Sequence, residues 1–198
     1  MRKLLFLPVL LLCLAGIARA GCDMNPQPME VGVSYDYVRV NTTFGVPTGG
    51  SGGGTTATNT GLNLNGWNAE AAYNPFCILG VVADFSGVYG TPSVAGFPIT
   101  SHVYSYVFGP RFNWRNSSPV TPFVETLFGG AHASFSNSGL GSLSSNAFEG
   151  NFGGGVDINL GGHWALRPKG DYVLTHFGGR TQNNGTVSVA IVFKFGGA

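Results

Sequence analysis

The sequence places charged side chains at alternating positions inside segments that are otherwise apolar and aromatic. The clearest case is GGHWALRPKGDYVLTHFGG at 161–179, where Arg167, Lys169 and Asp171 fall within five positions. Successive side chains of a β-strand point to opposite faces, so these three charges share one face and leave the other apolar. Ions removed from water need partners of opposite charge. The stretch therefore predicts a strand whose charged face is directed into an enclosed, ion-paired interior.

The same alternation in other segments collects further charges on this inner face. An arginine guanidinium can bind two carboxylates, so we expect Arg111 and Arg167 to be the centres of an ion network. We favour a structural salt-bridge plug, and the alternative is a switchable network that gates a narrow ion path. The predicted members are Asp36, Glu70, Asp84, Arg111, Glu125, Glu149, Asp157, Arg167, Lys169, Asp171 and Lys194.

A second candidate for chemistry is the pair His132 and Ser134, separated by one residue. This spacing resembles that of the lipid A 3-O-deacylases, whose serine nucleophile needs a base oriented by a third group. The nearest acid downstream, Glu149, belongs to the charged face, and His132 belongs to the apolar face. We therefore expect no enzyme activity. The remaining histidines show no metal-ligand spacing, so the sequence predicts neither a metal nor a cofactor.

The amino terminus carries its own signal. Arg2 and Lys3 precede a long apolar run that ends at an Ala-Arg-Ala motif, 18–20. This pattern predicts a secretory signal peptide over residues 1–20, followed by one domain over 21–198. No apolar run of membrane-helix length remains after cleavage.

Composition narrows the class of the exported domain. Loss of three basic residues with the leader leaves seven basic and nine acidic side chains, a net charge of −2, which gives no indication of a nucleic-acid partner. Glycine is abundant at 32 residues, aromatic residues reach 13% and charged residues only 10%. Few charges, many aromatic side chains and an export signal favour a β-barrel in an outer membrane.

Eight alternating segments support this class, and the connections between them alternate between short and long. Short turns at one end and longer loops at the other are typical of outer-membrane barrels, although a soluble barrel or sandwich is the alternative. The segments lie near 29–41, 61–74, 78–89, 102–114, 120–132, 147–160, 163–176 and 186–195. The four longer connections are 42–60, 90–101, 133–146 and 177–185.

The aromatic residues decide between lipid and water outside the barrel. Eighteen rings share the apolar parity, and an eight-stranded lumen is too narrow to hold them. They must face outward, where lipid is the consistent solvent. The sequence therefore predicts an all-β fold, an eight-stranded antiparallel transmembrane up-and-down β-barrel. The expected interface aromatics are Tyr89, Tyr104, Trp114 and Trp164.

Two places depart from the alternation. Phe123 and Leu127 share the parity of Glu125, and the first strand loses phase around 38–40. A β-bulge or an apolar plug near one rim would explain each departure.

Three stretches resemble the OmpA-type eight-stranded outer-membrane barrel family: TPFVETLFGGAH at 121–132, FGGGVDINLGGHWALRPKGDYVLTHFGG at 152–179 and VSVAIVFKFGG at 187–197. The resemblance implies a monomer in the outer membrane of a Gram-negative cell, in contact with outer-membrane lipids. It also implies insertion by the barrel-assembly machinery, which reads a C-terminal strand ending in an aromatic residue, here Phe195.

From these features we expect a role in envelope integrity or in surface interaction through the long loops, with an unknown surface ligand. The alternatives are a narrow cation-preferring channel and a lipid A-modifying surface hydrolase. The exported chain retains two cysteines, Cys22 and Cys77, which the strand order places at the same rim in an oxidising compartment. A disulfide between them is possible, and two unpaired thiols or a lipidated Cys22 are the alternatives.

Overall fold

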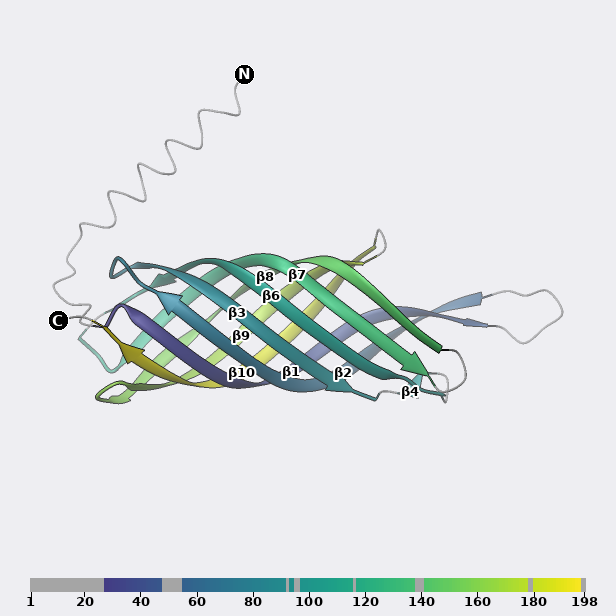
Figure 1. Cartoon of the computed structure of the whole chain (residues 1–198), viewed down its shortest axis with the longest axis horizontal. Coiled ribbons are helices and arrows are strands. Elements are labelled where there is room, and N and C mark those ends of the chain that lie inside the picture. Colours follow the sequence, from purple (N-terminus) through teal and green to yellow (C-terminus); the bar gives the residue numbers. More distant parts are fainter. Residues whose placement is uncertain are drawn as a thin grey trace, which may run out of the picture.

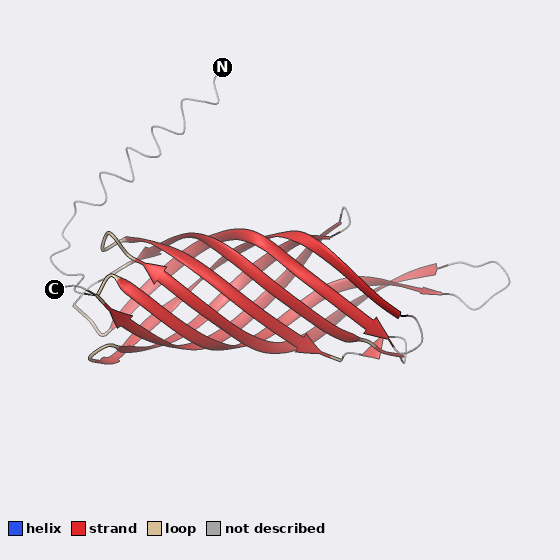
Figure 2. Cartoon of the chain, in the orientation of Figure 1, coloured by secondary structure: helices blue, strands red, loops and turns tan. Residues whose placement is uncertain are grey.

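The computed structural model describes residues 27–47, 55–91, 93–94, 97–115, 117–137, 141–177 and 180–196. Within them, eight long strands form a closed barrel, and a separate two-stranded sheet lies in one connection (Figures 1 and 2). The barrel strands are β1 (Met29–Pro47), β2 (Thr55–Tyr73), β3 (Leu79–Gly90), β6 (Thr100–Asn113), β7 (Val120–Asn137), β8 (Gly141–Gly161), β9 (Trp164–Phe177) and β10 (Arg180–Phe195). The small sheet pairs β4 (Ser93–Val94) with β5 (Phe97–Pro98).

The barrel has up-and-down topology, because each long strand pairs antiparallel with the next long strand of the chain. β1 and β10 close it, in a register that runs from Met29 opposite Phe195 to Arg39 opposite Gly185. The predicted fold class is confirmed. Within the described residues, no helix has the length and hydropathy needed to cross a membrane.

The two ends of the barrel differ. At the short-turn end, where the chain reverses between β2 and β3, β6 and β7, and β8 and β9, Gly161 and Gly162 have φ of 103° and 60°. Only glycine adopts such values at little cost, so this tight reversal depends on them. The opposite, long-loop end carries the other connections.

The strands extend further into the long connections than the sequence predicts. β1 and β2 remain paired as far as Pro47 opposite Thr55, and β7 and β8 as far as Asn137 opposite Gly141. Figure 1 shows the β1–β2 hairpin projecting beyond the rest of the barrel. Parts of both ranges predicted as loops, 42–60 and 133–146, are therefore paired strand in the structure. These stretches lack apolar alternation, but their threonine and serine residues continue an antiparallel ladder that the barrel has already set in register.

The lateral surface of the barrel is apolar and exposed. Aromatic and aliphatic side chains cover it, among them Phe108 and Leu160, each 66% exposed. Glycines opposite some rings let them lie flat: a Cβ on Gly130 would come within 2.6 Å of the Tyr106 hydroxyl oxygen.

At 38–40, where the sequence pattern loses phase, the structure supports an apolar rim and not a β-bulge. Val38 and Val40 are half-buried and line the lumen, and Arg39 between them is exposed. The alternation continues, but near the long-loop end the inner face becomes apolar. The pattern of polar and apolar residues therefore inverts without a bulge.

Candidate functional site: a charged lumen

The short-turn half of the lumen contains a balanced set of four acids and four bases. We call this set the plug. Three of the acids and three of the bases are at most 5% exposed, and the fourth acid, Glu70, is 8% exposed. Its members are Glu30, Glu70, Glu125, Asp157, Arg111, Arg115, Arg167 and Lys194.

Arg111, on β6, is fully buried and binds two carboxylates. Its Nε donates to Glu125 Oε2 at 2.7 Å, and one Nη also contacts this carboxylate. Its two Nη atoms donate to both oxygens of Glu70, at 2.9 and 2.7 Å. Glu70 lies on β2 and Glu125 on β7, so one guanidinium connects three strands. This bidentate pairing satisfies most of its donors inside a low-dielectric interior.

Arg167, on β9, makes the matching contacts on the other side of the lumen. Its Nε and Nη2 donate to the two oxygens of Asp157 at 2.5 and 2.8 Å. Nη2 also donates to Glu30 Oε2 at 2.6 Å, and Nη1 donates to Glu70 Oε1. Glu70 therefore bridges the two arginines across the lumen. Both predicted centres hold two or more carboxylates.

Phe123 completes this centre. The guanidinium carbons of Arg111 and Arg167 lie 4.5 and 5.0 Å from the centroid of its ring, which is 2% exposed. The ring points into the lumen, where its face attracts both cations. Leu127 also points inward, in a cluster with Ala72, Val82 and Val107. These two residues, which break the polar pattern of the sequence, therefore lie inside the lumen: Phe123 contacts the arginines of the plug, and Leu127 belongs to an apolar cluster.

Two members of the plug were missed from the sequence. Glu30 is 2% exposed and contacts Arg167, and Arg115 at the mouth donates to Glu30 Oε1 at 3.2 Å and to the Cys77 carbonyl at 3.1 Å. Glu30 shares the parity of Asp36, and that signal identifies it. Arg115 follows the end of its strand, where alternation carries no information.

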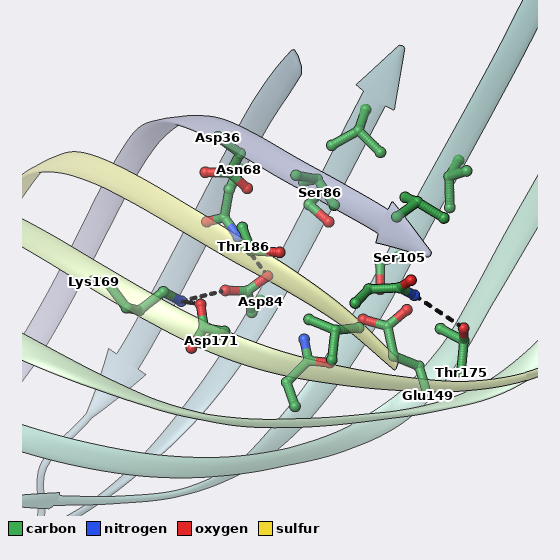
Figure 3. A pocket seen from close by; sticks show the side chains of 17 residues that line it. Asp36, Asn68, Asp84, Ser86, Ser105, Glu149, Lys169, Asp171, Thr175 and Thr186 are labelled. Carbon is green, nitrogen blue, oxygen red and sulfur yellow. Dashed lines mark hydrogen bonds and ion pairs between the residues drawn. The ribbon is translucent and has the colours of Figure 1, made fainter. Parts of the chain in front are cut away.

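On the long-loop side of the plug lies a cavity of about 70 Å³, which we call the chamber. Four acids line it, Asp36, Asp84, Glu149 and Asp171, with Lys169 as the base among the residues lining it. Figure 3 shows the Lys169 ammonium beside Asp84 and Asp171, with Glu149 farther along the lumen. Toward the long-loop end the lining is largely valine.

Lys169 joins the chamber to the plug. Its Nζ lies 3.0 Å from Glu125 and 3.7 Å from Glu70 of the plug, and 3.2 Å from Asp84 and 3.5 Å from Asp171 of the chamber. One ammonium thus serves four carboxylates. The structure places all eleven predicted lumen residues on the inner face, and among described residues nine of them form ion pairs. Asp36 and Glu149 are the two that do not.

The interface aromatics lie on the outer surface at the two ends. Near the long-loop end, Trp67 Nε1 donates to the Tyr89 hydroxyl at 3.3 Å, which donates to the Tyr104 hydroxyl at 3.4 Å. At the short-turn end, Trp114 and Trp164 are about half exposed. These positions match the two girdles of a membrane barrel.

The remaining predictions concern the His132 and Ser134 pair, metal binding and the disulfide. His132 Nδ1 lies 2.7 Å from Asn146 Oδ1, whereas Glu149 is buried on the inner face of the wall. In the described part of the chain, no three His, Cys, Asp or Glu side chains group closely enough to hold a metal. The predicted signal peptide, 1–20, and Cys22 lie outside the described residues, so the disulfide with Cys77 stays a prediction.

Solved structures of other proteins share this barrel geometry. No protein-family model and no curated protein matches the sequence. Neisserial surface protein A aligns with 87% of this chain and 100% of its own, at a TM-score of 0.65 and 14% identity. The chain has the fold of a small outer-membrane barrel.

Two further structures share that fold. Ail, the attachment invasion locus protein of Yersinia pestis, aligns with 84% of this chain and 98% of its own, at a TM-score of 0.52 and 20% identity. The N-terminal β-barrel domain of Pseudomonas aeruginosa OprF aligns with 85% of this chain and 100% of its own, at a TM-score of 0.50 and 10% identity.

Proposed function

We propose that the protein is a monomeric, OmpA-type barrel of a Gram-negative outer membrane, exported by the signal peptide at 1–20. The exposed apolar side chains around its wall support this, because contact with water would make such a surface aggregate. Outer-membrane lipids and, through the strand ending at Phe195, the barrel-assembly machinery are its proposed partners.

Within that membrane, we propose a role in envelope integrity or surface interaction, with a lumen that does not conduct. The observation that carries this proposal is the bridge from Arg111 through Glu70 to Arg167, which crosses the lumen with all three side chains buried. A diffusion pore needs an open aqueous path along its axis, and an eight-stranded barrel has little room beside such a plug.

The long-loop end is the proposed contact surface. The β1–β2 hairpin projects from it, and residues 40–64 carry no charged side chain. Ail, which shares the fold, is named for attachment and invasion. A variant that lacks residues 42–60, so that Asn41 and Gly61 form an Asn-Gly turn, tests this surface. It should lose surface binding and keep the stability of the barrel.

Two measurements test the proposal. Folded protein in detergent should migrate differently from heated protein on a gel, as a stable barrel does. In planar bilayers, the wild type should show no steady conductance, and frequent long openings would contradict the closed lumen. The acidic excess of the chamber favours one alternative, a narrow cation-preferring channel, which the same bilayer recordings would reveal.

We propose a non-catalytic protein. The partner of His132 is an asparagine amide, and a serine hydrolase needs an acid that orients its base. If the protein nevertheless hydrolyses lipid A esters, the Ser134→Ala variant should lose that activity. Activity that Ser134→Ala removes would overturn this part of the proposal.

A further inference from the structure

The chamber has more buried negative charge than the protein neutralises. Asp36 and Glu149 are each 4% exposed, and neither forms an ion pair with any described cation. The side-chain partner that the structure gives Asp36 is the Ser34 hydroxyl, at 2.6 Å. A carboxylate buried without a counter-ion is strongly disfavoured, so the chamber requires a positive charge from outside the chain.

The protein's own cations are already bound elsewhere. Arg111, Arg167 and Lys194 bind the acids of the plug, at distances of 2.9 Å or less. Lys169, the base in the lining of the chamber, divides its charge among four carboxylates, two of which belong to the plug. No rearrangement of these pairs neutralises the chamber without leaving the plug short of a cation.

Buried acceptor oxygens in the chamber wall add a second observation. Asp171 Oδ1 and Asn151 Oδ1 accept no hydrogen bond from the described residues. The Asp171 side chain is only 7% exposed, so bulk water does not replace that bond. Both atoms are acceptors in these groups, so their missing partner is a donor or a cation. Buried acceptors without partners are rare in folded proteins, and ordered water or an ion commonly supplies the contact.

We propose that the chamber binds a hydrated monovalent cation, Na⁺ or K⁺. A volume of about 70 Å³ accommodates several water molecules, since each needs roughly 10–15 Å³ of such space. The described acids do not converge in a group of three or more, so they contact the ion largely through water. Ca²⁺ takes six to eight close oxygen ligands, and the described acids here do not group closely enough to supply them.

Thermal unfolding of the full barrel in detergent tests the proposal. The unfolding temperature in NaCl or KCl should exceed that in N-methylglucamine chloride at equal ionic strength, because the bulky cation cannot enter. The difference should grow with the logarithm of the Na⁺ concentration, as expected for a ligand that binds the folded state alone. In crystals soaked with Tl⁺, anomalous density should appear between Asp36, Asp171 and Asn151.

Variants locate the effect. Asp36→Asn combined with Glu149→Gln removes the two unpaired charges and should weaken the Na⁺ dependence at least about tenfold in half-saturating concentration. Ser101→Ala changes a buried residue that does not line the chamber and whose cross-strand neighbours are Gly90 and Phe135, and it should keep the wild-type dependence. Equal unfolding temperatures in Na⁺ and N-methylglucamine, with no Tl⁺ density in the wild type, would overturn the proposal and leave protons as the neutralising charge. The Tl⁺ result decides the question even if the double variant does not fold.

Discussion

The plug and the chamber use the same kinds of residues in one lumen, and they differ in charge balance. Each has four buried acids, but the plug has four bases and the chamber has Lys169. In the plug every acid meets a guanidinium or an ammonium, and the four acids balance the four bases, so removal of any one member leaves a net charge. In the chamber, Asp36 and Glu149 have no such partner. Pairing thus makes one half of the lumen a structural element and leaves the other half able to bind.

The largest effect should come from removing a centre of the plug. Arg167→Ala leaves Glu30, Glu70 and Asp157 without their closest cation and should lower the free energy of unfolding by about 3–5 kcal/mol. Urea titration in detergent micelles measures this change. Arg39→Ala is the matched control, because Arg39 is exposed on the outer face, and it should unfold as the wild type does. Identical midpoints for the two variants would show that the plug does not stabilise the barrel.

A pair of amide substitutions compares the two regions directly. Glu70→Gln should cost about 3 kcal/mol, because Arg111 and Arg167 lose the carboxylate that joins them. Asp36→Asn makes the same chemical change in the chamber and should leave stability unchanged or raise it, since no ion pair is broken. Urea titration of both variants in medium without Na⁺ or K⁺ gives the result. A loss of stability in Asp36→Asn equal to that in Glu70→Gln would remove the distinction between plug and chamber.

A smaller effect should follow from changing Phe123, whose ring contacts both arginines. Phe123→Leu keeps an apolar side chain but removes the π face near both guanidinium groups, at a cost of about 1–2 kcal/mol. Phe128→Leu changes an exposed ring of the same strand and should have little effect in detergent. Unfolding midpoints of the two variants that move together would assign the loss to strand propensity and not to the plug.

The sequence predicts which face each charge occupies, but not its partner. Parity alone placed Arg111, Glu125 and Arg167 in the lumen. Partners depend on the relative height of strands that close the barrel: Glu70 and Arg167 are 97 residues apart and meet across the interior. Asp36 and Glu70 have the same local pattern, and only the closed register separates the acid of the chamber from the acid of the plug.

Phe123 shows a second limit of the sequence. An inward aromatic residue contradicts the rule that the lumen is polar, and its role is visible only with both guanidinium groups beside it. The extension of β1 to Pro47 is a third case, because uncharged threonine-rich strands carry little alternation to predict them.

The smallest expected effect concerns ion preference. Rare openings of the wild type, or leak through the Arg167→Ala variant, should favour cations over anions, because any path passes the acids of the chamber. Reversal potentials in a KCl gradient measure this preference, which should weaken at high salt as the Debye length shortens. Asp84→Asn, which removes a carboxylate 3.2 Å from Lys169, should reduce it further, and Ser101→Ala should not. Anion preference would mean that the path avoids the chamber, and an unchanged reversal potential in Asp84→Asn would mean that its acids do not set the field along the path.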